Sequence, residues 1–232
     1  MKKIGLVGGI SWTSTIDYYR LINEGVNNQL GGINFAECII YSVNFNDFVT
    51  NNTSGNWDAT YQLLYQACIS LEKSGAEGIL LCANTAHAVA DQLQQNIGLP
   101  IIHIVDALAA EISRSGLNQI GLLGTKFTME MDFYKDRLAQ SGIKTLVPAK
   151  LEARDYIQQT LKEELGKGII NPETKQSYLS IITQLVEDGA QGIVLGCTDI
   201  PMLISSNDVA GPVFDTTAIH AASAVEFMLA NY

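Results

Sequence analysis

An internal repeat constrains the fold of this 232-residue chain more than any other feature. Three segments of the first half recur in the second half, in the same order and at nearly constant offsets of 116, 115 and 114 residues. The pairs are IGLVGG at 4–9 with IGLLGT at 120–125, DYYRLI at 17–22 with DFYKDRL at 132–138, and SGAEGILL at 74–81 with DGAQGIVL at 188–195. Three ordered matches at nearly one offset indicate a duplicated unit, so we expect two lobes of the same architecture.

Within the first half, strand-like apolar runs alternate with helical patterns. Strands are predicted in KKIGLVGG, FAECIIYSV, AEGILLCA and LPIIHI, and helices over about 14–29, 58–74 and 86–95. This alternation is typical of a parallel sheet covered by helices. The predicted fold class is therefore α/β, with two pseudo-symmetric parallel-sheet lobes.

The lobe boundaries follow from the repeat and from the C-terminal tail. The tail PVFDTTAIHAASAVEFMLANY reads as a strand end and a helix that cross back to complete the first lobe. We therefore expect residues 1–115 with 211–232 to form the first lobe, and residues 116–210 to form the second. Open α/β sheets bind ligands at the carboxyl ends of their strands, which predicts an active site in the cleft between the lobes.

The composition excludes several classes of protein. The formal net charge of −10 argues against a surface that binds nucleic acid or an anionic membrane. Gly8 and Gly9 interrupt the apolar N-terminal run, and no apolar run reaches transmembrane length, so we expect a cytoplasmic protein whose chain begins with a strand. The four cysteines show no CxxC or Cys/His metal spacing, which favours free thiols and no metal site.

Two matched loops, CANTAH at 82–87 and GCTD at 196–199, carry the polar residues that follow the repeated strands. A thiol at such a strand end lies near helix N-terminal dipoles, so we expect Cys197 to have a lowered pKa. In the register of the repeat, Cys197 corresponds to Ala83, and Cys82 comes one residue earlier. One residue reverses the side-chain direction in an extended segment, so Cys82 faces a substrate only if the loop kinks.

A third loop, GGISWTST at 8–15, combines glycines with a dense set of hydroxyls before a predicted helix. Backbone N–H groups and the positive end of that helix favour an anion there. The loop is neither GxGxxG nor a Walker A motif, so neither a dinucleotide nor an NTP is predicted. The residues expected to bind a substrate carboxylate are Ile10, Ser11, Asn84, Thr85 and Thr198.

An acid/base group on each wall of a cleft suits removal of a proton from one face of a carbon and its return on the other. Two groups of thiol type can racemise an amino acid in this way without a cofactor, provided that its carboxylate and amine are held. His87 follows the first polar loop as a helix cap or as support for the groups that contact substrate. His103 and His220 lie in apolar surroundings, which favours structural roles.

The chain resembles the aspartate/glutamate racemase family over essentially its whole length. The segments that carry the resemblance are MKKIGLVGGISWTSTIDYYRLIN, NTAH, GAQGIVLGCTDI and PVFDTTAIHA. The nearest likeness is to the PLP-independent aspartate and broad-specificity amino-acid racemases. The resemblance implies an isomerase of amino-acid metabolism that uses no cofactor, takes a small-molecule amino acid and forms a homodimer, with no nucleic-acid or membrane partner.

Residue by residue, the resemblance makes Cys197 the second catalytic cysteine of the family. Asn84 and Thr85 match the pair that helps to hold the substrate carboxylate, and Thr198 matches its counterpart in the other lobe.

Two positions depart from the family's pattern. Ala83 stands where the family usually has its first catalytic cysteine, so Cys82 is a catalytic partner only with a kinked loop. Otherwise water or a hydroxyl such as that of Thr85 must supply the proton. Asp199 stands where the family commonly has glutamate, and we expect both Asp199 and Ala83 among the substrate-binding residues.

The substrate side chain is recognised, in relatives, by groups in the stretch that is NFNDFVTNN at 44–52 here. This stretch contains no Arg or Lys, so Asn52 and other neutral donors are the expected contacts. Lys167 and Arg154 are candidate cations from the other lobe. The resemblance implies aspartate or a related amino acid.

Two alternatives remain open at this stage. One is a one-cysteine decarboxylase or isomerase of the same fold, which needs protonation on one face only. The other is a non-catalytic amino-acid-binding protein that keeps the anion-binding loops.

Overall fold

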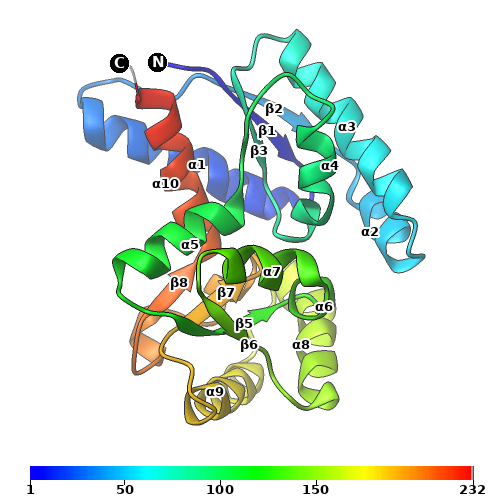
Figure 1. Ribbon diagram of the computed structural model, residues 1–232, viewed down its shortest axis with the longest axis vertical. Coiled ribbons are helices and arrows are strands. Elements are labelled where there is room, and N and C mark those ends of the chain that lie inside the picture. Colours follow the sequence, from blue (N-terminus) through cyan, green and yellow to red (C-terminus); the bar gives the residue numbers. More distant parts are fainter. Residues whose placement is uncertain (231) are drawn as a thin grey trace. The chain divides into compact units, whose positions relative to one another are not determined.

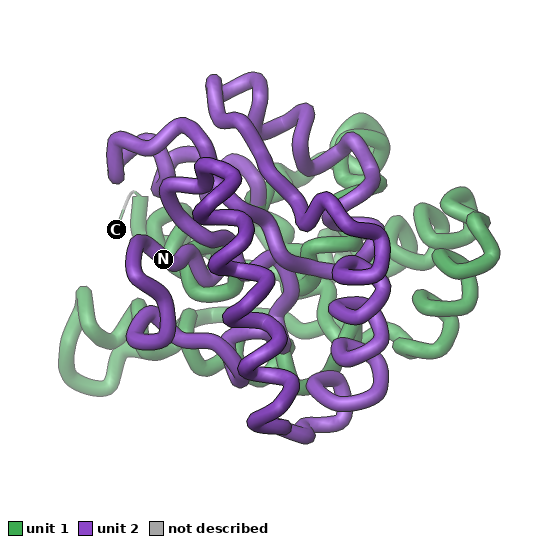
Figure 2. Tube along the Cα trace, turned by 90° about the horizontal axis from the view of Figure 1, so that it is seen from below, with its two compact units in different colours: residues 1–104, 217–232 green, residues 105–216 purple. Residues whose placement is uncertain are grey.

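The structure is a computed structural model that describes residues 1–230 and 232. This part of the chain forms two compact units, coloured separately in Figure 2. Unit 1 comprises residues 1–104 with 217–232, and unit 2 comprises residues 105–216. The chain therefore passes between the units after Ile104 and after Thr216, which differs from the predicted boundaries after 115 and 210.

Unit 1 contains a parallel four-stranded sheet in the order β2-β1-β3-β4 (Figure 1). Its strands are β1 (Ile4–Gly8), β2 (Cys38–Ser42), β3 (Gly78–Leu81) and β4 (Ile101–Ile102). Its helices are α1 (Trp12–Leu30), α2 (Phe45–Thr53), α3 (Trp57–Lys73), the 3-10 helix η1 (Thr85–Val89), α4 (Ala90–Gln94) and α10 (Thr216–Leu229), whose first residue belongs to unit 2.

Unit 2 repeats the same sheet topology, with the parallel order β6-β5-β7-β8. Its strands are β5 (Gln119–Gly124), β6 (Lys144–Leu146), β7 (Ile193–Gly196) and β8 (Val213–Asp215). Its helices are α5 (Ile104–Arg114), which begins on the last residue of unit 1, α6 (Lys126–Glu130), α7 (Asp132–Gln140), α8 (Leu151–Glu163), η2 (Leu165–Lys167), α9 (Pro172–Glu187), η3 (Ile200–Met202) and η4 (Ser206–Asp208). The predicted α/β class with two pseudo-symmetric parallel sheets is confirmed.

The central strands of unit 1 are buried on both faces, as parallel sheets require. Side chains of β1 and β3 alternate between two apolar clusters, with Val7, Ile79 and Leu81 in one cluster and Leu6 and Leu80 in the other. The first cluster packs under α3 and α4, and the second packs under α1 and α10. This alternation decides which way the residues after β3 point.

The C-terminal tail divides between the two units. Helix α10 packs Ala221, Ala224 and Val225 into the core of unit 1, because its inward face is apolar and made of small residues. The strand before it does not complete the first lobe: β8 pairs with β7 in the second sheet, where Phe214 lies opposite Val194. This pairing is the reason that residues 211–216 belong to unit 2.

Helix α2 is absent from the predicted elements, which treat 44–52 as a substrate-contacting stretch. Asn44 caps this nine-residue helix by accepting a hydrogen bond from the backbone N–H of Asn46. Only Phe48 and Asn52 are buried in it, so its apolar stripe is too narrow to show in the sequence pattern.

No described helix, over 1–230, is both long and apolar enough to cross a membrane.

Candidate functional site

The chain bends at Cys82 and Ala83, where the N–H of Ala83 donates to the carbonyl of Leu81 at 2.8 Å, but the side chains keep the alternation of β3. The backbone N–H of Cys82 donates to the carbonyl of Val7 at 3.0 Å, so sheet pairing extends one residue past β3. Cys82 is fully buried in the cluster of Leu80, and its Sγ contacts the Leu80 carbonyl at 3.8 Å. Ala83 lies in the opposite cluster. Burial raises the pKa of the Cys82 thiol far above its usual range, so its location suits a core thiol.

The register of the two sheets gives the same correspondence as the sequence repeat. In unit 1 Leu81 pairs with Val7, and in unit 2 Leu195 pairs with Leu123. Val7 and Leu123 are matched by the repeat, so Leu81 corresponds to Leu195. Two residues further on, Ala83 corresponds to Cys197, Asn84 to Thr198 and Thr85 to Asp199.

The loop between β1 and α1 has an unusual backbone. Ser11 has φ 55°, a positive value that non-glycine residues rarely adopt and that typically costs about 1–3 kcal/mol. Gly9 precedes it at φ 80°, and a Cβ there would lie 2.3 Å from the carbonyl oxygen of Val43. Such strain is retained mainly where a site needs a particular backbone shape.

Hydrogen bonds within this loop hold that shape. The N–H of Gly9 donates to Oγ1 of Thr15 at 2.9 Å, and the hydroxyls of Thr15 and Ser14 each donate to the carbonyl of Ser11 at 3.0 Å. The hydroxyls of Ser11 and Thr13 also contact each other. Ser11 caps α1 by position but accepts no side-chain capping bond. The loop therefore brings backbone N–H groups to the start of a 19-residue helix, which is a favourable place for an anion.

The other predicted residues of unit 1 are largely enclosed. Ile10, Asn84 and Thr85 are 5, 4 and 7% exposed. Asn52 is 3% exposed, and its Oδ1 accepts a hydrogen bond from the hydroxyl of Thr60 at 2.5 Å. That bond joins α2 to α3, so the structure gives Asn52 a packing role.

In unit 2, Cys197 follows β7 directly and is half-buried. Burial raises the pKa of its thiol to about 12, and the Asp199 carboxylate raises that pKa further, against the backbone N–H groups of Asp199 and Thr198, which lower it. The predicted lowering of the Cys197 pKa is therefore wrong for the free protein. Burial and the Asp199 carboxylate outweigh the backbone N–H groups, and the helix that follows, η3, is only three residues long.

Tyr178 on α9 is a neighbour of Cys197 for which the sequence predicts no role. It is fully buried, and its hydroxyl hydrogen-bonds with that of Thr160 at 3.0 Å. Burial raises the pKa of Tyr178, and the negative charge of the Cys197 thiolate adds to this. In the sequence Tyr178 occupies an apolar helix position, which gives no signal of proximity to a thiol.

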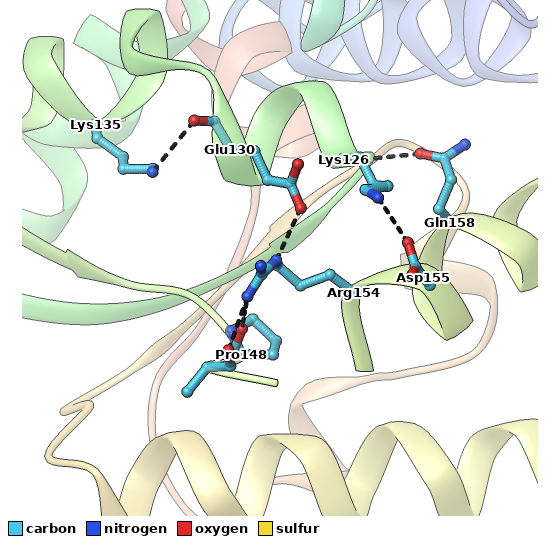
Figure 3. A network of polar contacts seen from close by, with 8 residues as sticks. Lys126, Glu130, Lys135, Pro148, Arg154, Asp155 and Gln158 are labelled. Carbon is cyan, nitrogen blue, oxygen red and sulfur yellow. Dashed lines mark hydrogen bonds and ion pairs between the residues drawn. The ribbon is translucent and has the colours of Figure 1, made fainter. Parts of the chain in front are cut away.

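The two candidate cations of unit 2 are bound within that unit. Arg154 donates from Nε to Glu130 at 2.8 Å and from Nη1 to the carbonyl of Pro148 at 2.6 Å, contacts that Figure 3 draws as dashed lines. Lys167 pairs with Glu163 at 2.7 Å.

Lys126 is a further cation of unit 2, close to the carboxyl ends of β5 and β7. It lies two residues beyond Gly124, and Gly124 pairs with Gly196, the residue before Cys197. Its Nζ donates to Asp155 at 2.6 Å (Figure 3), and this hydrogen bond raises the pKa of the lysine. The sequence analysis names Lys167 and Arg154 instead, because nothing in the sequence shows which lysine or arginine follows a strand end near Cys197.

Among the described residues, no group of three or more His, Cys, Asp or Glu side chains could hold a metal ion. All four cysteines are free thiols.

Comparison with known proteins identifies the architecture. Residues 7–224 match the family described as Asp/Glu/Hydantoin racemase. The chain is 46% identical to a candidate Asp/Glu racemase from Yersinia pestis, with 99% of this chain and 100% of that chain covered and a TM-score of 0.92. It is 36% identical to an aspartate racemase homologue from Pyrococcus horikoshii OT3, with 99 and 100% covered and a TM-score of 0.86. It is also 26% identical to the broad specificity amino-acid racemase RacX of Bacillus subtilis, with 98% of each chain covered.

Proposed function

The chain belongs to the Asp/Glu/hydantoin racemase family, and we propose that it is a PLP-independent racemase of aspartate or a related amino acid. The observation that carries the proposal is the shared register of the two strand-end loops, Ala83–Asn84 after β3 and Cys197–Thr198 after β7. The likeness to the RacX and aspartate racemase homologue chains supports an amino-acid substrate.

In the proposed reaction the Cys197 thiolate removes the α-proton from one face of the amino acid. The electron pair left on Cα delocalises into the α-carboxylate, which the loop at 8–15, Asn84, Thr85 and Thr198 hold through neutral donors. Return of a proton to the opposite face completes the inversion. The raised pKa of free Cys197 disfavours the thiolate, and a substrate ammonium group close to Sγ would stabilise it.

The face of the substrate opposite Cys197 has no thiol to supply a proton in this mechanism. Ala83 occupies the position that matches Cys197, and its methyl group has no proton to give. We propose that water or the hydroxyl of Thr85 supplies the proton there. Inversion is then slower than removal and return of the proton on the Cys197 face.

A cation would bind the side-chain carboxylate of an acidic substrate more strongly than neutral donors do. We propose that Lys126 provides it, because this lysine follows β5 at the edge where Cys197 follows β7. To do so, the ammonium group of Lys126 would leave its hydrogen bond with Asp155 and bind the substrate carboxylate. Asp199 would then lie beside Cys197 and orient the substrate ammonium.

We further propose that the protein is a homodimer formed through an apolar surface on α1 and β2. Trp12, Ile16, Tyr19 and Ile40 are 69, 54, 49 and 43% exposed, and the last three line one shallow hollow. Together they expose roughly 450 Å² of side chain, close to the apolar area that one partner supplies to a standard interface. Free thiols and the acidic composition support a cytoplasmic location.

Sedimentation of the wild type and of Tyr19→Glu tests the dimer. The substitution is expected to convert a dimer into a monomer, whereas Ile169→Glu, at a residue 51% exposed in unit 2, leaves the dimer intact. A monomeric wild type, or equal behaviour of the two variants, contradicts this surface.

The function itself is tested by incubating the protein in D₂O with single enantiomers of amino acids and following α-deuteration and chiral composition. Aspartate or a close relative is expected to gain deuterium, and to protect Cys197 from alkylation. Release of CO₂ without racemisation would support a one-cysteine decarboxylase. Binding that protects Cys197 with no deuteration of any amino acid would support a binding protein and overturn the proposal.

A further inference from the structure

The three histidines of the chain gather in unit 1, next to the loop that follows β3. The ring of His87 lies 4.6 Å from that of His103 and 5.4 Å from that of His220, measured between centroids. The three residues are 2, 7 and 0% exposed. They come from η1, the segment after β4 and the first turns of α10, so the fold assembles them from distant parts of the sequence.

His87 uses both ring nitrogens to join two backbone groups. The N–H of Ile104 donates to its Nε2 at 3.2 Å, so Nε2 carries no proton. Nδ1 then carries the proton and donates to the carbonyl of Ala83 at 2.9 Å. The imidazole is therefore neutral, in a tautomer set by its partners, and it bridges the Ala83 carbonyl to the first residue of α5.

Each end of this bridge has a consequence. At α5, His87 accepts from one of the N–H groups that a helix start leaves without an intrahelical partner. At the loop, the bond fixes the direction of the peptide group between Ala83 and Asn84. Because that peptide is planar and trans, the N–H of Asn84 points away from the Ala83 carbonyl and so away from the imidazole.

We propose that His87 is a positioning residue for the reaction proposed above: its imidazole sets the peptide that presents Asn84 to the substrate carboxylate. This inference rests on the proposed function, in which Asn84 holds that carboxylate. His87 touches neither substrate nor the α-proton, and it acts by fixing the loop to the start of α5.

His220 provides a matched control. It is equally buried and also makes two hydrogen bonds, from Nε2 to the Ile102 carbonyl at 2.7 Å and between Nδ1 and the Tyr18 hydroxyl at 2.8 Å. Neither of these two bonds involves the backbone of residues 83–85. Its ring packs against that of His87 at 5.4 Å, so loss of its hydrogen bonds costs stability, but both hydrogen bonds of His87 to the backbone remain.

The test compares His87→Leu, His87→Asn and His220→Leu by kinetics of α-proton exchange and by amide hydrogen exchange. His87→Leu is expected to lower kcat roughly 10–100-fold and to raise KM, since a small misplacement of a substrate-holding group has effects of that size. His87→Asn retains a donor at the place of Nδ1 and is expected to recover most of kcat. His220→Leu is expected to lower Tm as much as His87→Leu does, with kcat of the folded protein unchanged.

The amide of Ile104 gives a readout that does not depend on activity. Its exchange is expected to be at least tenfold faster in His87→Leu than in His220→Leu. Equal kcat in the two leucine variants, or no recovery in His87→Asn, overturns the positioning role. If the wild type exchanges no α-proton at all, the proposed function fails; equal Ile104 protection in both variants would then overturn the bridge as well.

Discussion

The loops after β3 and β7 share one register, yet they differ in chemistry and in how they are held. The β7 loop presents a half-buried thiol at Cys197, whereas the β3 loop presents a methyl group at Ala83. His87 ties the β3 loop to the start of α5, and the matching residue in unit 2 is Pro201, which has neither a backbone donor nor a polar side chain. The two units thus share the same strand register. The β7 loop carries the reactive thiol, and the β3 loop has the backbone that a side chain holds in place.

Removal of the Cys197 thiol should have the largest effect on α-proton exchange. Cys197→Ala is expected to reduce α-proton exchange by about 10²–10⁴-fold, the usual contribution of a positioned acid/base group. The measurement is α-deuteration in D₂O by NMR. Cys38→Ala, at a half-buried cysteine of unit 1, is the control and should keep wild-type exchange. Unchanged exchange in Cys197→Ala would remove the thiol from the mechanism.

Making the two loops alike should sharpen the comparison. Ala83→Cys is expected to increase racemisation, by up to about 10²-fold where the new thiol is well placed, because it supplies an acid on the second face. Cys82→Ala should leave activity nearly unchanged and cost about 1–2 kcal/mol of stability, since Cys82 is a buried core residue. Loss of activity in Cys82→Ala with none gained in Ala83→Cys would make Cys82 the partner.

The pH dependence of Cys197 alkylation is a smaller effect than those of the substitutions above. With the pKa of Cys197 at about 12, its alkylation in the free protein should rise about tenfold per pH unit from pH 7 to about 11. The unfolded chain releases this proton near pH 8.5, so the wild type should lose stability relative to Cys197→Ala as pH rises from there towards 12. Peptide mapping would show whether Cys197 reacts alone; a plateau near pH 8 would mean that the thiolate is already stable.

The sequence was informative where the fold depends on local alternation. The repeat predicts both sheets, because the matched apolar runs become β1, β3, β5 and β7 in the same strand order. The register of Ala83 against Cys197 also follows from the repeat, since strand alternation persists through Cys82.

The rest depends on distances that a pattern does not contain. The pKa of Cys197 is set first by burial and then by the Asp199 carboxylate, and the sequence shows neither the burial nor the distance between these side chains. The ring of His87 accepts a hydrogen bond from Ile104, which is 17 residues away in the sequence, and the ring of His220 bonds to Ile102, which is 118 residues away. Helix α2 gives no periodic pattern in the sequence because only two of its residues are buried.

The most direct test of the central claim is made on the wild type alone. The protein is incubated in D₂O with each enantiomer of aspartate in turn, and for the enantiomer that exchanges faster the initial rate of α-deuteration with retention is compared with the initial rate of inversion. Since only the Cys197 face has its own acid/base group, retention with deuterium is expected to exceed inversion at early times. Inversion that keeps pace with every deuteration event would contradict it, because the face that Ala83 occupies would then have a proton donor as effective as Cys197.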